Sequence, residues 1–112
     1  MTAGPLAPRD LLILAALLED ELHGYGLIKA VEERSEGEVE LDPANLYRAL
    51  RRMQRDGWIR EVRSSEDAGA RRRTYAITAS GRALLRREVE RLDQLLRQVR
   101  PALASGGRSG RG

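Results

Sequence analysis

Apolar residues recur along most of this chain every three or four positions, the spacing that brings them to one side of a helix. Residues 58–63 and 73–78 differ, because their aromatic and β-branched residues are typical of strands. Proline or an N-cap residue marks the helix starts, and Pro101 is expected to end the last helix. These signals predict four helices, over residues 8–22, 25–34, 43–56 and 79–100.

The predicted order is three helices, a two-stranded wing and a long helix. This is the order of a winged helix-turn-helix, in which the third helix reads DNA. The expected fold is therefore mainly α with a small β-wing. We expect a DNA-binding domain over residues 1–78, a dimerisation helix over 79–103 and a disordered tail over 104–112, whose Gly/Ser/Arg composition cannot form a core.

The third predicted helix has two contrasting sides. Asp42 is its expected N-cap and Pro43 its first residue, and its apolar positions fall within a narrow arc. The opposite side carries four arginines at three- and four-residue spacings, which repel one another unless an anion lies opposite. A solvated surface is the simpler alternative, but such faces usually mix charge signs. We therefore predict DNA contact by Asn45, Arg48, Arg51, Arg52 and Arg55.

The net charge of +3 is unevenly distributed. Residues 1–42 carry three basic and ten acidic side chains, residues 43–78 carry nine and four, and residues 79–112 carry eight and three. Basic charge therefore gathers on particular elements, as expected for a protein with a polyanionic partner. A triplet of arginines follows the polar turn between the two predicted strands and ends on the first residue of the second strand: Arg71, Arg72 and Arg73. It is expected to contact DNA phosphates, unless it is surface decoration.

The last predicted helix carries apolar residues spaced four, three, four and three apart, which is the pattern of a coiled-coil seam. The seam could cover the protein's own domain, but the preceding elements already supply enough core-facing residues. We therefore predict a homodimer held together by Leu85, Val89, Leu92, Leu96 and Val99.

Several classes of function are excluded by the residues present. The sequence has no cysteine and only one histidine, His23. We therefore predict no metal, no cofactor and no enzymatic activity, since no nucleophile–base pair is apparent either. The longest apolar run, residues 11–18, is too short to span a bilayer, and no signal peptide precedes it, so we expect a cytoplasmic protein without membrane contact.

Three motifs resemble the PadR family of transcriptional regulators, in the order that the family has. They are LHGYGL at residues 22–27, NLYRALRRMQRDGWI at 45–59 and RRTYAITASGR at 72–82. The resemblance covers roughly residues 8–100. Arg48 departs from the family pattern, which often has proline there, and adds charge to the third helix.

The resemblance implies a homodimeric repressor, of the type with a short C-terminus, that releases double-stranded operator DNA when a small-molecule effector binds. The effector of such regulators is often a phenolic or drug-like compound. The last helix has no aromatic residue that could stack on a planar effector. The resemblance also places further residues at the DNA: Tyr25, Tyr47 and the front of the third helix, which includes Ala44. Two alternatives stay open, a protein-interaction module and a constitutive architectural DNA binder.

Overall fold

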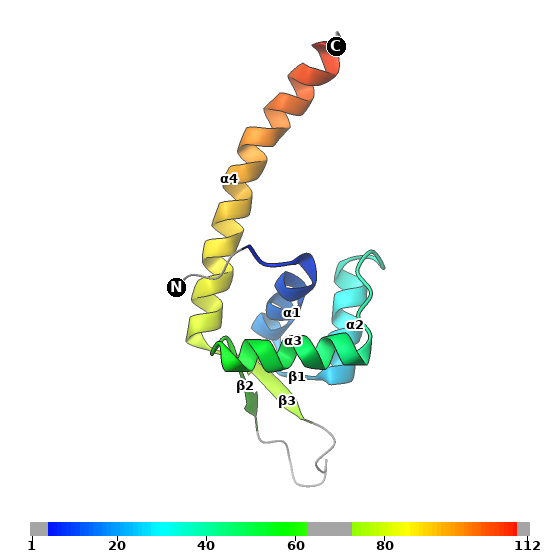
Figure 1. The fold of residues 1–112 in the computed structure, drawn as a ribbon, viewed down its shortest axis with the longest axis vertical. Coiled ribbons are helices and arrows are strands. Elements are labelled where there is room, and N and C mark those ends of the chain that lie inside the picture. Colours follow the sequence, from blue (N-terminus) through cyan, green and yellow to red (C-terminus); the bar gives the residue numbers. More distant parts are fainter. Residues whose placement is uncertain (1–4, 63–72, 110–112) are drawn as a thin grey trace.

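The computed structural model describes residues 5–62 and 73–109, and Figure 1 shows its arrangement. The helices are α1 (Pro8–Glu19), α2 (Gly24–Arg34), α3 (Pro43–Arg55) and α4 (Ala79–Ser109). The strands are β1 (Leu22–His23), β2 (Ile59–Val62) and β3 (Thr74–Ile77). The predicted class, mainly α with a small β-wing, is confirmed.

The first three helices enclose the core, and each contributes completely buried side chains. Ile13 and Leu14 come from α1, Leu27 comes from α2, and Leu46 and Leu50 come from α3. These residues lie at the three- and four-residue spacings that predicted the helices, because one face of each helix leaves water when the three pack together. The core therefore fixes which face of α3 remains outside.

The sheet has three strands rather than the two predicted. Its order is β1-β3-β2 and all pairs are antiparallel, with Leu22 opposite Tyr75 and Ile59 opposite Ile77. The predicted helix over residues 8–22 is accordingly too long at its C-terminal end. A two-residue strand is too short to show an alternation of apolar and polar residues. Its conformation is stabilised by pairing with a strand about fifty residues later in the chain.

The start of α4 is fixed tightly against the end of α3. The Thr78 hydroxyl accepts a hydrogen bond from the Gly81 amide at 3.0 Å, so Thr78 is the N-cap of α4. The same hydroxyl donates to the Trp58 carbonyl oxygen at 3.0 Å. A Cβ atom at Gly81 would lie 2.1 Å from that oxygen, so the helix can approach this closely only with glycine there. The direction in which α4 leaves the domain is therefore set by a backbone contact.

The predicted end of the last helix at Arg100 is wrong. Helix α4 continues through Pro101 to Ser109, so that residues 104–109 of the expected tail are helical. Proline removes one backbone hydrogen bond and normally ends or kinks a helix. Here Ala102, Leu103 and Ala104 follow it, and these residues have high helix propensity, which favours continuation. Helix α4 projects from the domain along the longest dimension of the molecule, 64 Å (Figure 1).

Candidate nucleic-acid interface

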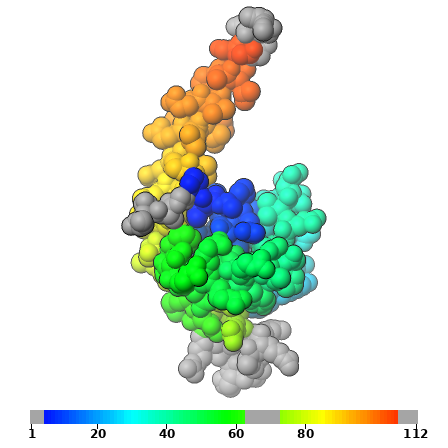
Figure 2. All heavy atoms as spheres, viewed as in Figure 1, coloured from blue at the N-terminus to red at the C-terminus, as the bar shows by residue number. Residues whose placement is uncertain are grey.

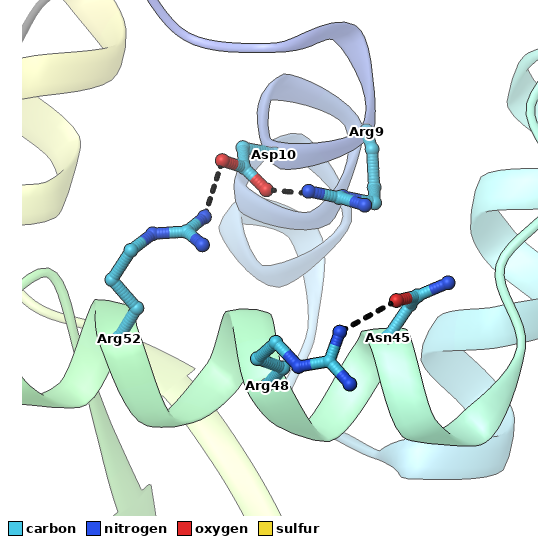
Figure 3. Close-up of polar contacts among 5 residues, drawn as sticks. All are labelled: Arg9, Asp10, Asn45, Arg48 and Arg52. Carbon is cyan, nitrogen blue, oxygen red and sulfur yellow. Dashed lines mark hydrogen bonds and ion pairs between the residues drawn. The ribbon is translucent and has the colours of Figure 1, made fainter.

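The N-terminal turn of α3 is ordered by a chain of hydrogen bonds on its exposed side. The Asp42 carboxylate accepts from the Asn45 backbone amide at 2.8 Å and from its side-chain amide at 3.1 Å. The Asn45 side-chain oxygen in turn accepts from Arg48 Nη1 at 3.1 Å (Figure 3). Asp42 is therefore the predicted N-cap, and the side chains of Asn45 and Arg48 are aligned with each other at the surface.

The two sides of α3 are arranged as the sequence predicts, with one exception. Leu46, Ala49, Leu50 and Met53 are buried, and the opposite side is exposed. Figure 2 shows that α3, in green, lies across the outside of the domain. Three of the four arginines are exposed: Arg48, Arg51 and Arg55. No ion pair to these three occurs among residues 5–62 and 73–109, so their charge faces solvent uncompensated.

The exception is Arg52, whose side chain is directed toward α1 rather than away from the domain. Its Nη2 atom lies 2.5 Å from Oδ2 of Asp10, which is in the first turn of α1 (Figure 3). The Asp10 side chain is 9% exposed and that of Arg52 is 35% exposed. Sequence reasoning missed this contact, because nothing local relates Asp10 to a residue 42 positions later in the chain.

Two tyrosines lie where α2 meets the start of α3. Tyr25 is 67% exposed and stacks beside His23, with ring centroids 6.5 Å apart. The His23 ring accepts a hydrogen bond from the Gly26 amide and so caps α2. The Tyr47 hydroxyl lies against Gly24, where a Cβ atom would approach it to 2.6 Å. Gly24 therefore permits close packing of the two helices, and both tyrosine side chains remain exposed.

The wing is only partly within the described residues. Arg71 and Arg72 lie outside them, and Arg73 is exposed at the start of β3. Arg73 Nε is 3.7 Å from the Glu61 carboxylate of β2, a surface pair that contributes little to stability. Burial raises the pKa of Tyr75, which faces the core from the same strand, and nearby Glu61 raises it further. Tyr75 therefore stays neutral and anchors the wing.

The apolar seam of α4 is divided between two environments. Leu85 is 6% exposed and belongs to the protomer's own core, so it differs from its predicted place in a dimer interface. Its position at the base of α4, where the helix still packs on the domain, explains the difference. Leu92 is half-buried, whereas Val89, Leu96 and Val99 are exposed on the projecting part of the helix. Leu103 continues the same spacing and is also exposed.

A buried carboxylate holds the N-terminal segment against α4. Glu88 accepts hydrogen bonds from Arg91 Nε at 3.0 Å and from the Leu6 amide at 3.2 Å. The Arg91 guanidinium holds the pKa of the Glu88 carboxyl below its ordinary value, and the Leu6 amide contributes in the same direction. Glu88 therefore remains charged near neutral pH and stabilises the base of α4.

Across the described part of the chain, no helix is both long enough and apolar enough to cross a membrane.

Comparison with known proteins matches the chain to a protein family and to several relatives. The model of the transcriptional regulator PadR-like family matches residues 13–87. The transcriptional regulator Rv3488 of Mycobacterium tuberculosis is 34% identical over 87 residues, which cover 78% of either chain. A longer, uncharacterised 37.1 kDa protein in a transposon of Streptomyces fradiae is 36% identical over 80% of this chain, which spans about a quarter (24%) of that relative's length.

Solved structures show the same fold. A PadR family transcription regulator from Clostridium difficile superposes with a TM-score of 0.65 and 26% identity, covering 88% of this chain and 97% of that one. Bacillus subtilis PadR, whose structure is a complex with operator DNA, gives a TM-score of 0.61 and 22% identity over 71% of this chain and 46% of that one. The predicted winged helix-turn-helix fold is thereby confirmed. The chain belongs to the PadR-like family of transcriptional regulators.

Proposed function

We propose that this protein is a homodimeric repressor that binds operator DNA and releases it when a small molecule binds. The observation that carries the proposal is the exposed face of α3. Arg48, Arg51 and Arg55 lie on it without an acidic partner in the described residues. Like charges at this spacing destabilise a helix, and the phosphates of double-stranded DNA would remove that repulsion.

The proposed docking places the N-terminal half of α3 in the major groove. Residues at this end of a recognition helix normally reach base edges, and Asn45 and Arg48 are already aligned there by their hydrogen bond. Arg51 and Arg55 would neutralise phosphates. The remaining proposed contacts come from α2, from α3 itself and from the sequence of the wing: Tyr25, Ala44, Tyr47, Arg71, Arg72 and Arg73.

Arg48→Ala is expected to weaken operator binding more than binding to random DNA. A bidentate hydrogen bond from arginine to guanine discriminates against other bases by about 1–3 kcal/mol, whereas removing a phosphate contact weakens binding to every sequence equally. Titration of labelled operator and random duplexes at one salt concentration gives the ratio of affinities. Arg55→Ala is the control and should leave that ratio unchanged. An equal loss of affinity for both duplexes in Arg48→Ala would mean that Arg48 binds phosphate.

The wing arginines should behave in the opposite way. Replacing Arg72 and Arg73 by alanine is expected to weaken all DNA alike and to flatten the dependence of log K on log salt, by roughly 0.9 for each phosphate that is no longer neutralised. Replacing Arg97 and Arg100 of α4, which are exposed and far along the projecting helix, removes the same charge and should leave the slope unchanged. A wing variant with the wild-type slope would place these residues away from DNA.

The exposed apolar stripe of α4 supports the homodimer. Val89, Leu96 and Val99 lie on the projecting helix, and leucine and valine at alternating four- and three-residue spacing pair well with a second such helix. In a two-fold dimer, this pairing would set the distance between the two copies of α3, which must match one turn of DNA, about 34 Å. An effector that changes the packing of α4 would change that distance and release the DNA.

Two other functions are separated from this one by simple titrations. A protein-interaction module would show no preference for any duplex sequence. A constitutive architectural binder would keep its DNA in the presence of every candidate effector, so a screen of phenolic compounds against the preformed complex tests the effector directly. The proposal requires sequence preference in the first titration and release by at least one compound in the second.

A further inference from the structure

Asp10 is a buried carboxylate in a domain whose other acidic residues are mostly at the surface. It lies in the first turn of α1, where the helix dipole favours negative charge, and it is 6% exposed. A carboxylate that leaves water needs a charged or hydrogen-bonding partner, because an unpaired one is strongly destabilising. The domain therefore needs a partner for Asp10 in order to be stable.

Arg52 supplies that partner from α3. Its guanidinium donates to Asp10 Oδ2 at 2.5 Å, whereas the other oxygen, Oδ1, is 3.5 Å from Arg9 Nε and has no hydrogen bond within the described part of the chain. Figure 3 shows Asp10 between these two arginines, one on its own helix and one reaching up from α3. The hydrogen bond from Arg52 thus holds α3 to the first turn of α1.

The other arginines of α3 differ from Arg52 in direction and in surroundings. Arg48 lies along the exposed surface toward Asn45, and Arg55 is exposed without an acidic partner in the ranges that the structure covers. Arg52 lies closest to the buried arc of the helix, beside Ala49, and only its edge reaches solvent. Its positive charge is therefore largely compensated inside the protomer.

We propose that Asp10 and Arg52 form a positioning pair, in which Asp10 holds Arg52 on α1 and withdraws its charge from the DNA. Arg52 is then a positioning residue for the recognition helix, and Arg48, Arg51 and Arg55 are the arginines of α3 that contact DNA. This inference rests on the proposed function. Removing a phosphate contact weakens binding to every sequence equally, so one fewer free arginine lowers the affinity for any duplex.

The test is the salt dependence of binding to a random duplex, measured for matched variants. Arg55→Gln should reduce the slope of log K against log salt by roughly 0.9, and Arg52→Gln should leave it at the wild-type value. Asp10→Ala frees Arg52 and should raise the slope by roughly 0.9, which means about 3.5-fold more loss of affinity between 50 and 200 mM salt.

A second variant is needed in case Arg52→Gln leaves Asp10 unpaired and so unfolds the protein. Asp10→Asn combined with Arg52→Gln replaces the ion pair by two neutral amides that can still hydrogen-bond, and its slope should equal that of the wild type. A slope reduced to that of Arg55→Gln, in either Arg52 variant, would overturn the inference by showing that Arg52 contacts phosphate. If the wild type binds no duplex, the proposed function fails, and the inference fails with it.

Discussion

Replacing Leu96 by glutamate is expected to convert the proposed homodimer into monomers without unfolding the protomer. Leu96 is 45% exposed on the projecting part of α4, so a carboxylate there stays in contact with water while the protomer is alone. In a dimer, the seam would bring two such carboxylates into a dry interface. An unpaired buried charge costs about 3–5 kcal/mol, which raises the dissociation constant of the dimer by roughly 10²–10³-fold or more.

Operator affinity should fall when the dimer dissociates, although every arginine on α3 is unchanged. Two linked reading helices bind two half-sites with an avidity that one helix alone lacks. Sedimentation at micromolar concentration gives the oligomeric state, and titration of the operator gives the affinity. Gln94→Glu adds the same charge on the opposite side of α4 and should remain dimeric. A dimeric Leu96→Glu protein with normal operator binding would show that the stripe does not form the interface.

Gly81→Ala is expected to produce a large loss of stability. The added Cβ atom would lie 2.1 Å from the Trp58 carbonyl oxygen, which is backbone and already accepts hydrogen bonds from Thr78. The start of α4 must therefore move away from the domain, which costs about 3 kcal/mol, the upper part of the usual range for overpacking. For a domain of this size, the Tm should fall by more than about 10 °C.

The matched control for this change lies in the same helix. Gly106 is exposed in α4, and a Cβ atom there meets nothing within 4 Å. Because alanine favours helix over glycine, Gly106→Ala should leave the Tm unchanged or raise it slightly. Thermal unfolding followed by circular dichroism compares the two variants. Equal Tm values for Gly81→Ala and the wild type would mean that α4 does not approach Trp58 as closely as the structure shows.

Helix α3 could be predicted from the sequence because its determinants are local. Its N-cap, its first proline and its buried arc all lie within fourteen consecutive residues, and each occupies its expected place. The strand β1 could not be predicted, since its conformation depends on pairing with β3. The continuation of α4 past Pro101 was missed because a rule for the proline outweighed the propensities of the residues after it.

The candidate site, too, could be predicted from the sequence only where its determinants are local. The exposed positions of Arg48, Arg51 and Arg55 follow from helical geometry alone. The pairing of Arg52 with Asp10 depends on how α1 and α3 pack, and a charge pattern within one helix carries no information about a partner on another. The burial of Leu85 could not be predicted for a similar reason. A continuous apolar seam does not show where the helix stops packing against its own domain.

Selection of bound sequences from a pool of random duplexes tests the central claim most directly, since the protein itself then picks out its operator. If two copies of α3 read DNA, the wild type should enrich an inverted repeat whose half-site centres are about one helical turn, or a multiple of it, apart. Arg48→Ala should enrich the same repeat with one position in each half relaxed. Recovery of a random pool, with no enriched sequence, would contradict the account.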